Sequence, residues 1–245
     1  MKLLIDGDIL VYRCGFAAQQ GRGDEVIAEP VENALHNVKE VIETIKQRLG
    51  SEDVLVFISG DDNFRFDIAT ERPYKGNRAD APKPVHYAAI QEYLKQKYPY
   101  KVSEGQEADD DLGIMQTELT EGGNWEASCI VSIDKDMDMI PGNHYNWVKE
   151  EPYFVDENEA LLAFYTQLIT GDTTDNIPGI PKKGKVAARK ALADTKTEEQ
   201  MYSAVRDLYV QAFTEKFADE ALLEQARLLW IRRKPDELWE PPNVE

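Results

Sequence analysis

Acidic residues form dense groups along the 245-residue chain, and carboxylates are the side chains that a hydrolytic metal site needs. Carboxylates with no histidine or cysteine nearby favour hard cations such as Mg²⁺ or Mn²⁺ over zinc. Two such ions suit phosphodiester hydrolysis, because one activates a water molecule and the other, about 3.5–4 Å away, stabilises the leaving oxygen. The five groups are Asp6 and Asp8; Asp61 and Asp62; Glu107, Asp109, Asp110 and Asp111; Asp134 and Asp136; and Asp172 and Asp175.

Two of these groups, taken alone, also have a structural interpretation. Acids favour the first turn of a helix, which would explain residues 107–111. Asp and Asn favour turns, which would explain residues 172–176. Other chemistries are disfavoured, since the three histidines lie in no Ser or Cys triad pattern and the chain has no G-x-x-x-x-G-K-[ST] loop. A calcium loop starting at Asp134 also fails, because Met139 and Tyr145 occupy its Gly and Glu positions.

Three of the acidic groups follow short apolar runs that predict β-strands. Residues 2–5, 54–59 and 128–133 are nearly continuous apolar stretches, as in parallel strands buried on both faces. The carboxyl ends of parallel strands share one edge of a sheet, so we expect the acids to converge there. Packed carboxylates repel one another and gain raised pKa values unless cations neutralise them. The pattern therefore favours a metal site at this edge, to which all five groups contribute.

Helical periodicity alternates with the strands in the first part of the chain and replaces them in the second. This order predicts an α/β fold, with a central, mostly parallel sheet flanked by helices over residues 1–157 and a helical region over residues 158–245. The predicted helices are 31–49, 85–98 and 109–119 in the first part, and 160–169, 186–193, 198–213 and 220–233 in the second.

The net charge of −18 argues at first against a nucleic-acid partner, because phosphate binding draws on Lys and Arg. The basic residues are concentrated, however. Residues 182–190 hold five basic side chains and no acid, and residues 72–83 hold four basic side chains and one acid. Either these runs bind phosphate beside a metal site, or they are chance runs on a solvated acidic surface. Charge alone leaves both interpretations open.

The sequence shows no feature of a membrane or secreted protein. No apolar run approaches the roughly 18–20 residues of a membrane span, and MKLLIDGD reaches an acid too early for a signal peptide. Cys14 and Cys129 lie too far apart for a disulfide framework or a zinc pair. We expect a soluble protein of a reducing compartment, the cytoplasm (the host cytoplasm for a viral protein), with no membrane partner.

Five segments in the same order resemble the 5′ nuclease superfamily, which includes flap endonucleases, the 5′-exonuclease domains of bacterial DNA polymerases and, most similar, free-standing bacteriophage 5′–3′ exonucleases. The resemblance runs from Leu3 to about Leu192, with fainter likeness to the end. It implies a PIN-like nuclease core followed by a helical DNA-binding region. The segments are LLIDGDILVYR, FRFDIATERPYKGNR, GQEADDDLG, SIDKDMDMI and TGDTTDNIPGIPKKGKVAARKAL.

The resemblance implies which carboxylates bind metal. The aspartate that relatives carry after the second strand has no direct equivalent, because Gly60 stands at its place; Asp61 is the residue we assign instead. Asp8 and Asp111 are additional acids outside the expected ligand set. The expected ligands are Asp6, Asp61, Glu107, Asp109, Asp110, Asp134, Asp136, Asp172 and Asp175.

Two basic segments resemble DNA contacts of the family. Residues 74–78, YKGNR, resemble part of an arch or clamp, near residues 62–90, which implies that Lys75 and Arg78 contact the scissile phosphate; a surface basic loop is the alternative. Arg13 is a further expected DNA contact. A helix–three-turn–helix near residues 172–193 implies phosphate contacts through backbone amides and a K⁺ ion, although Lys182 stands where relatives often have Gly. The expected contacts there are Gly179, Ile180, Lys182, Lys183, Gly184 and Lys185.

The resemblance thus implies a 5′–3′ exonuclease or flap endonuclease that uses two Mg²⁺ or Mn²⁺ ions on duplex or branched DNA at or near 5′ ends. RNA–DNA hybrids are a second expected substrate, because backbone contacts do not by themselves exclude RNA. One alternative is a PIN-type ribonuclease, which would lack the arch-like segment and the basic hairpin. The other is a non-catalytic DNA-binding relative, which the motif acids disfavour.

Overall fold

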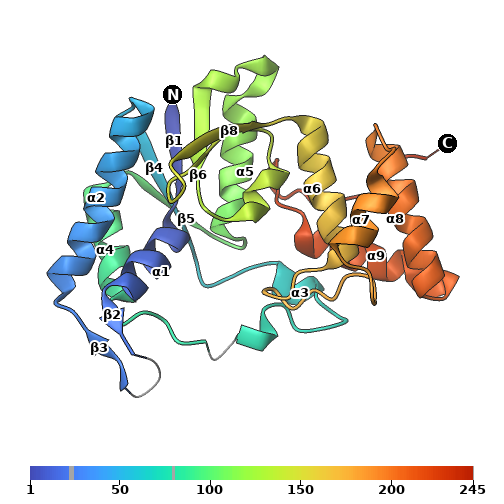
Figure 1. Cartoon of the computed structure of the whole chain (residues 1–245), viewed down its shortest axis with the longest axis horizontal. Helices are drawn as coiled ribbons and strands as arrows, with labels where there is room; N and C mark the ends of the chain where they lie inside the picture. Colours follow the sequence, from blue (N-terminus) through green and yellow to red (C-terminus); the bar gives the residue numbers. More distant parts are fainter. Residues whose placement is uncertain (22–24, 79–80, 245) are drawn as a thin grey trace. The chain divides into compact units, whose positions relative to one another are not determined.

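The computed structural model describes residues 1–21, 25–78 and 81–244, and they form two compact units (Figure 1). Residues 79–80 of the predicted arch segment, and residues 22–24, lie outside the described residues. Unit 1 consists of Met1–Asp62, Ala81–Met137 and Gly142–Phe154, and unit 2 consists of Asn63–Asp80, Asp138–Pro141 and Val155–Glu245. Most of the segment predicted as an arch is therefore part of unit 2.

Unit 1 is built on a sheet in which β1 (Lys2–Asp6) lies between β4 (Val54–Ser59) and β6 (Ser128–Val131). Both neighbours pair with β1 in parallel, with Leu3 opposite Val54 on one side and Cys129 on the other. The predicted strands are confirmed, although β6 ends two residues before the predicted end. The remaining strands were not predicted; the full order is β5 (Tyr100–Ser103), β4, β1, β6, β7 (Gly142–Asn146) and β8 (Glu151–Val155).

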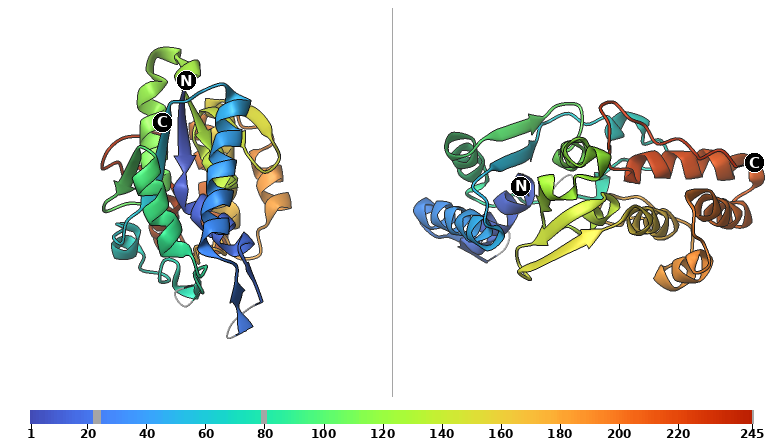
Figure 2. Two further views of the ribbon diagram at one scale, coloured as in Figure 1. Left: turned by 90° about the vertical axis from the view of Figure 1, so that its left-hand side faces the viewer. Right: turned by 90° about the horizontal axis from the view of Figure 1, so that it is seen from above.

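Helices cover both faces of this sheet (Figure 2). Leu3 and Ile5 of β1 share one buried cluster with α1, α2 and α4, whereas the intervening Leu4 faces the side covered by α5, since successive side chains of a strand alternate between faces. α2 matches its predicted bounds, and α1 was not predicted as a helix. The bounds are α1 Gly7–Ala17, α2 Val31–Leu49, α4 Tyr87–Lys97 and α5 Ala108–Leu119. A small hairpin, β2 (Gln19–Gln20) and β3 (Ile27–Ala28), follows α1.

Unit 2 is helical, as predicted for the second part of the chain. Phe164 and Tyr165 of α6, Tyr209 of α8 and Trp230 after α9 are buried in it. The bounds are α3 Arg65–Ile68, α6 Glu157–Thr170, α7 Lys185–Leu192, α8 Glu198–Ala212 and α9 Glu215–Leu229. In the described ranges, no helix combines the length and the apolar character that crossing a membrane requires.

The last helix, predicted over residues 220–233, begins at Glu215 and ends at Leu229, and a distant side chain contacts its C-terminal end. The Arg65 guanidinium, buried in unit 2, donates hydrogen bonds to the carbonyl oxygens of Leu228 (2.9 Å) and Trp230 (2.7 Å). These carbonyls need partners at a helix C-terminus, and a cation is favoured there by the helix dipole. The same contacts tie the start of segment 63–78 to α9.

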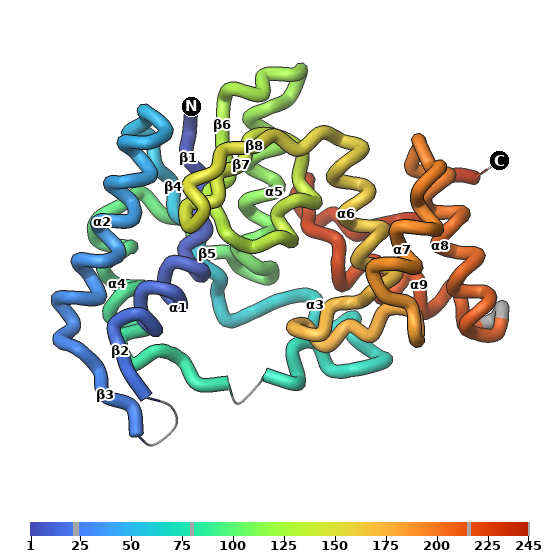
Figure 3. Tube along the Cα trace, viewed as in Figure 1, coloured from blue at the N-terminus to red at the C-terminus, as the bar shows by residue number. Residues whose placement is uncertain are grey.

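Segment 63–78 is fixed to unit 2 at a second place. The Glu224 carboxylate of α9 accepts hydrogen bonds from the backbone N–H groups of Thr70 (2.8 Å) and Glu71 (2.7 Å), and from the Thr70 hydroxyl. Figure 3 shows the segment continuing beside the loop that follows α6. Residues separated by about half the chain therefore form one local structure.

Candidate active site

The acids after β1, β4 and β6 lie at one edge of the unit 1 sheet, and hydrogen bonds join the strand ends there. The Ser132 hydroxyl, one residue past β6, donates to Asp6 at the end of β1 (2.7 Å). The Asp8 carboxylate accepts from the backbone N–H of Ser59, at the end of β4 (3.1 Å). The Ser59 hydroxyl in turn accepts from the N–H of Ala108, at the start of α5 (2.9 Å). The predicted edge thus brings together four chain segments that carry acids.

Asp6 is almost completely buried, and its electrostatic environment is unfavourable. Burial, followed by repulsion from Asp8 and then Asp134, raises the pKa of Asp6 from 3.8 to about 7. Hydrogen bonds from the Ile9 N–H (3.0 Å) and from Ser132 oppose this shift without cancelling it. The charges that act on this carboxylate are other carboxylates, so a cation would stabilise its ionised form.

The donor set fits a hard divalent cation. Asp6 and Asp134 supply oxygen atoms, and a divalent cation would relieve the repulsion that Asp8 and Asp134 exert on Asp6. Among the described residues, no three His, Cys, Asp or Glu side chains are arranged so that they could already hold a metal ion together. Ligation by these residues stays a prediction.

Asp134 and Asp136 are held in a turn after β6. The Ser132 hydroxyl accepts from the Asp134 N–H (3.0 Å), and the Asp134 carboxylate accepts from the Asp136 N–H (2.9 Å). Asp136 also lies 3.1 Å from the ammonium group of Lys135. The turn therefore explains locally why Asp134 and Asp136 are two residues apart. The second carboxylate oxygen of Asp134 takes no part in these two hydrogen bonds.

The acids at the start of α5 divide into different roles. The fully buried Asp110 accepts a hydrogen bond from the backbone N–H of Glu107 (3.1 Å), which supports the capping interpretation for this residue. Asp111 pairs with Lys101 (2.8 Å) and accepts from Gln106 (2.8 Å), in keeping with its exclusion from the expected ligands. Whether Glu107, Asp109 and Asp110 bind metal stays a prediction.

The position of Gly60 explains the missing aspartate after β4. A Cβ atom on Gly60 would lie 2.4 Å from the carbonyl oxygen of Ser103, so any other residue would have to displace the backbone of β5. Asp61 follows directly. Burial raises the pKa of the nearby Tyr87 hydroxyl to about 12, and the charges of Asp8, Tyr12 and Asp61 add to this shift. Asp8 and Asp61 thus both act on Tyr87, and metal binding by Asp61 stays a prediction.

In unit 2, Asp172 organises the loop between α6 and α7. Its carboxylate accepts from Gln167 (2.8 Å) and from the backbone N–H of Thr174 (2.7 Å), and its backbone pairs with Ile177. Gly179 closes the loop at φ 64, where a Cβ would lie 2.3 Å from the Gly171 nitrogen. These bonds match the turn interpretation of the DTTDN segment. Metal binding by Asp172 stays a prediction from the resemblance.

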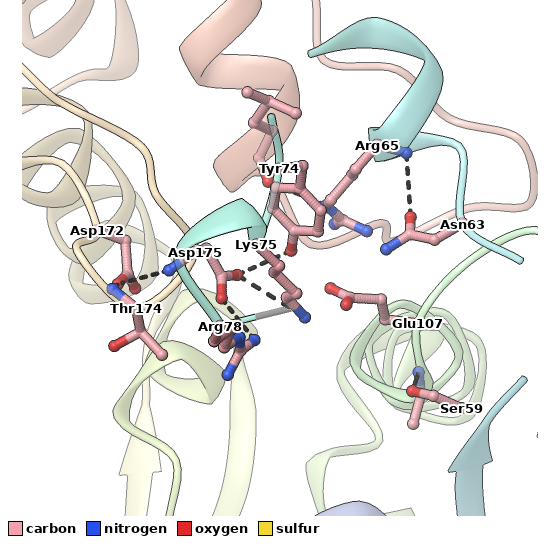
Figure 4. Close-up of polar contacts among 12 residues, drawn as sticks. Ser59, Asn63, Arg65, Tyr74, Lys75, Arg78, Glu107, Asp172, Thr174 and Asp175 are labelled. Carbon is pink, nitrogen blue, oxygen red and sulfur yellow. Dashed lines mark hydrogen bonds and ion pairs between the residues drawn. The ribbon is translucent and has the colours of Figure 1, made fainter. Parts of the chain in front are cut away.

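Lys75 and Arg78 lie against the same loop (Figure 4). Arg78 donates to one Asp175 oxygen (2.7 Å), the Tyr74 hydroxyl donates to the other (2.8 Å), and the Lys75 ammonium lies 3.9 Å from the latter. The sequence predicted the two cations but not that Tyr74 and Asp175 would be their partners. The Tyr-Lys-Gly-Asn-Arg segment can be recognised in the sequence, but only the folded structure shows that Asp175 is the acid it contacts.

The remaining predicted DNA contacts have defined surroundings. Arg13, on α1 of unit 1, lies over the Trp147 ring at 5.6 Å. In unit 2, Lys182 has φ 61, the left-handed conformation that Gly adopts readily, so the turn forms although Lys replaces Gly. The backbone of Ile180 donates to Ile169 (2.9 Å) and accepts from Lys183 (3.0 Å), and Gly184 and Lys185 begin α7. DNA binding by these residues stays a prediction.

Comparison with known proteins identifies the class of this protein. Residues 1–165 match the family described as the 5′–3′ exonuclease, N-terminal resolvase-like domain. The chain therefore belongs to the 5′–3′ exonuclease family and is a 5′ nuclease. The predicted family and fold class are confirmed.

Two relatives and one solved structure illustrate the similarity. The 5′–3′ exonuclease of Buchnera aphidicola subsp. Schizaphis graminum is 29% identical over 226 residues, 84% of this chain and 74% of that protein. DNA polymerase I of Bacillus caldotenax is 26% identical over 250 residues, 94% of this chain but 28% of the polymerase. The 5′-exonuclease of bacteriophage T5, solved with bound zinc, has a TM-score of 0.65 and 19% identity, covering 93% of this chain and 88% of that one.

Proposed function

We propose that this chain hydrolyses phosphodiester bonds of duplex or branched DNA at or near 5′ ends, with divalent metal ions bound at the carboxylate edge of unit 1. The observation that carries the proposal is the buried Asp6 at the edge where the acid-bearing strand ends meet: it accepts a hydrogen bond from Ser132 after β6, and burial and neighbouring carboxylates raise its pKa to about 7. A carboxylate in this state binds a divalent cation favourably, because the cation offsets both causes of the shift.

The residues proposed as metal ligands in unit 1 are Asp6, Asp61, Glu107, Asp109, Asp110, Asp134 and Asp136. A bound Mg²⁺ or Mn²⁺ would lower the pKa of a water molecule and polarise the phosphate. The protein contributes orientation: Ser132 fixes Asp6 and the turn at Asp134, and Asp8 fixes the end of β4. Asp172 and Asp175 are proposed from the resemblance alone.

Lys75 and Arg78 are the residues proposed to meet the scissile phosphate. Cationic donors offset charge that develops on phosphoryl oxygens, and donors that are already oriented do so at no reorganisation cost during the reaction. Basic residues after Gly179 are proposed to bind the backbone of duplex DNA together with a K⁺ ion, which would favour duplex over single strands. RNA–DNA hybrids are proposed as a second substrate because backbone contacts read no sequence.

One assay tests this proposal. The wild-type protein is incubated with a 5′-labelled duplex, a flap substrate, an RNA–DNA hybrid and a single-stranded RNA, each with Mg²⁺, with Mn²⁺ and with chelator. We expect metal-dependent cleavage of the duplex or the flap and no cleavage with chelator. Cleavage of single-stranded RNA alone would support the PIN-type ribonuclease instead. No cleavage of any DNA at stoichiometric protein would contradict the proposal and favour a non-catalytic DNA-binding role.

A further inference from the structure

The Asp175 carboxylate is surrounded by hydrogen-bond donors from one short segment. Arg78 contacts Oδ1 at 2.7 Å, the Tyr74 hydroxyl contacts Oδ2 at 2.8 Å, and the Lys75 ammonium lies 3.9 Å from Oδ2. Both oxygen atoms therefore have partners, and two of the three partners are cations. The Arg78 contact is a charge-assisted hydrogen bond, which is stronger and shorter than a neutral one, and Lys75 adds an ion pair at longer distance.

The backbone holds these side chains in register. The Lys75 N–H donates to the Asp175 carbonyl oxygen (3.0 Å), and the Asn176 amide donates to the Pro73 carbonyl oxygen (2.9 Å). Lys75 and Asn176 both adopt left-handed backbone conformations, at φ 55 and φ 63. Such conformations are costly for residues other than Gly and persist where surrounding contacts determine them. The meeting of the two segments is therefore specified by several bonds that do not involve the Asp175 side chain.

The carboxylate has a distinct role within this frame, because the two cations would otherwise repel each other. The side chains of Lys75 and Arg78 are 25% and 40% exposed, so each can still reach a ligand in solvent, whereas the Asp175 side chain is 21% exposed. The carboxylate of Asp172, three residues earlier, accepts hydrogen bonds from Gln167 and from the backbone of its own loop. Asp175 is an acid of this loop that contacts both cations.

We propose that Asp175 is a positioning residue: its carboxylate holds Lys75 and Arg78 side by side as a preset pair for a phosphate of the substrate. The inference rests on the proposed function for the identity of the ligand. It assigns to Asp175 the orientation of the two cations, and this role is separate from the metal binding proposed for Asp175 from the resemblance. Preset cations lower the barrier because their orientation is settled before the phosphate arrives.

The first test is a double-mutant cycle measured by single-turnover cleavage of a 5′-labelled duplex. If Asp175 acts through Arg78, Asp175→Asn should slow cleavage about tenfold in the wild-type background but less than about threefold in the Arg78→Gln background, because coupled residues are non-additive. Equal losses in both backgrounds would overturn the inference, since they would show that Asp175 acts independently of Arg78. Asp207 is an exposed acid of α8, so Asp207→Asn is the matched control. It should leave the cleavage rate unchanged in both the wild-type and the Arg78→Gln backgrounds.

The second test needs neither metal nor DNA. Trypsin cuts after Lys75 and Arg78, and proteolysis of folded proteins reports local opening. In chelator, Asp175→Asn should be cut at these two positions at least about fivefold faster than wild type, whereas Asp207→Asn should be cut at the wild-type rate. The asparagine variant keeps similar volume and one acceptor, and circular dichroism before digestion checks that it is folded. Wild-type digestion kinetics at both positions would overturn the inference even if the protein cleaves DNA as proposed.

Discussion

Asp6, Asp8 and Asp134 of unit 1 and Asp175 of unit 2 have opposite electrostatic environments. Asp6 is buried beside Asp8 and Asp134, and its pKa is raised to about 7. Asp175 is contacted by Arg78 and Lys75 and accepts a hydrogen bond from Tyr74. The first group has charge that an external cation must offset, whereas the second is already offset by side chains of the protein.

This difference shows that the residue type alone does not define the role of an acid in this protein. An uncompensated carboxylate destabilises the metal-free fold and gains from metal binding, and a compensated one stabilises the fold and orients its partners. Substitutions that remove the charge of Asp6 and of Asp175 should therefore have opposite effects on the stability of the metal-free protein.

The largest expected effect comes from removing a carboxylate of the uncompensated group. Asp134→Asn should reduce single-turnover cleavage by about 10³-fold or more, because a site that binds and orients the metal loses charge. Binding of duplex DNA in chelator should change little, which a fluorescence anisotropy titration would check. Loss of DNA binding together with cleavage would instead indicate that Asp134 serves folding.

A cation of the compensated group should have the next largest effect. Arg78→Gln should lower kcat about 100-fold, because a donor aimed at developing phosphoryl charge is lost. Steady-state kinetics on a 5′-labelled duplex measures this change. Lys196→Gln, an exposed lysine of unit 2 outside the basic run, is the control and should keep kcat. A similar loss in both variants would show that net charge matters and position does not.

The metal-free stability of the protein should reveal the raised pKa of Asp6. The folded-state pKa lies above the unfolded value, so this group favours folding below pH 4, and that contribution is lost as the pH rises towards 7. Asp6→Asn keeps an acceptor for the Ile9 N–H and should raise the free energy of unfolding in chelator by about 2 kcal/mol at pH 8. This is about half of the roughly 4 kcal/mol that the full shift of about three pKa units would imply.

Urea unfolding of wild type and Asp6→Asn at pH 5 and pH 8 measures this difference. The gain should shrink at pH 5, and Mg²⁺ should raise the stability of wild type more than that of the variant, because a ligand stabilises the state that binds it. Asp175→Asn is the comparison and should lower the stability. A lower stability for Asp6→Asn at pH 8 would contradict the contrast between the two groups.

The smallest effect concerns the backbone of the loop before α7. Lys182→Gly should raise the free energy of unfolding by about 0.5–1 kcal/mol, because Gly adopts φ 61 without the penalty that Lys carries. Lys183→Gly removes the same charge at a residue without positive φ and should lower the stability. Thermal unfolding of both variants measures the two changes in stability. Equal changes would show that the lost charge, and not the backbone conformation, determines the stability.

Much of this fold could be predicted because its signals are local. The apolar runs before Asp6, Asp61 and Asp134 predicted β1, β4 and β6, and the periodicity of residues 31–49 predicted α2 with its observed bounds. α1 was missed because it follows β1 without a loop: Asp6 is both the last residue of β1 and the N-cap of α1. The end of α9 was wrong because Arg65, 163 residues before Leu228, supplies the partner for its carbonyl oxygens.

The sequence by itself determined which residue types follow each strand, and hence that carboxylates gather at one edge of the unit 1 sheet, because strand direction and side-chain period are properties of the local chain. The tertiary structure decided which carboxylates keep an uncompensated charge. Gly60 is required because β5 approaches it, and Asp175 is neutralised by Arg78, which lies 97 residues earlier. Electrostatic roles depend on distance in space, and sequence spacing does not fix that distance.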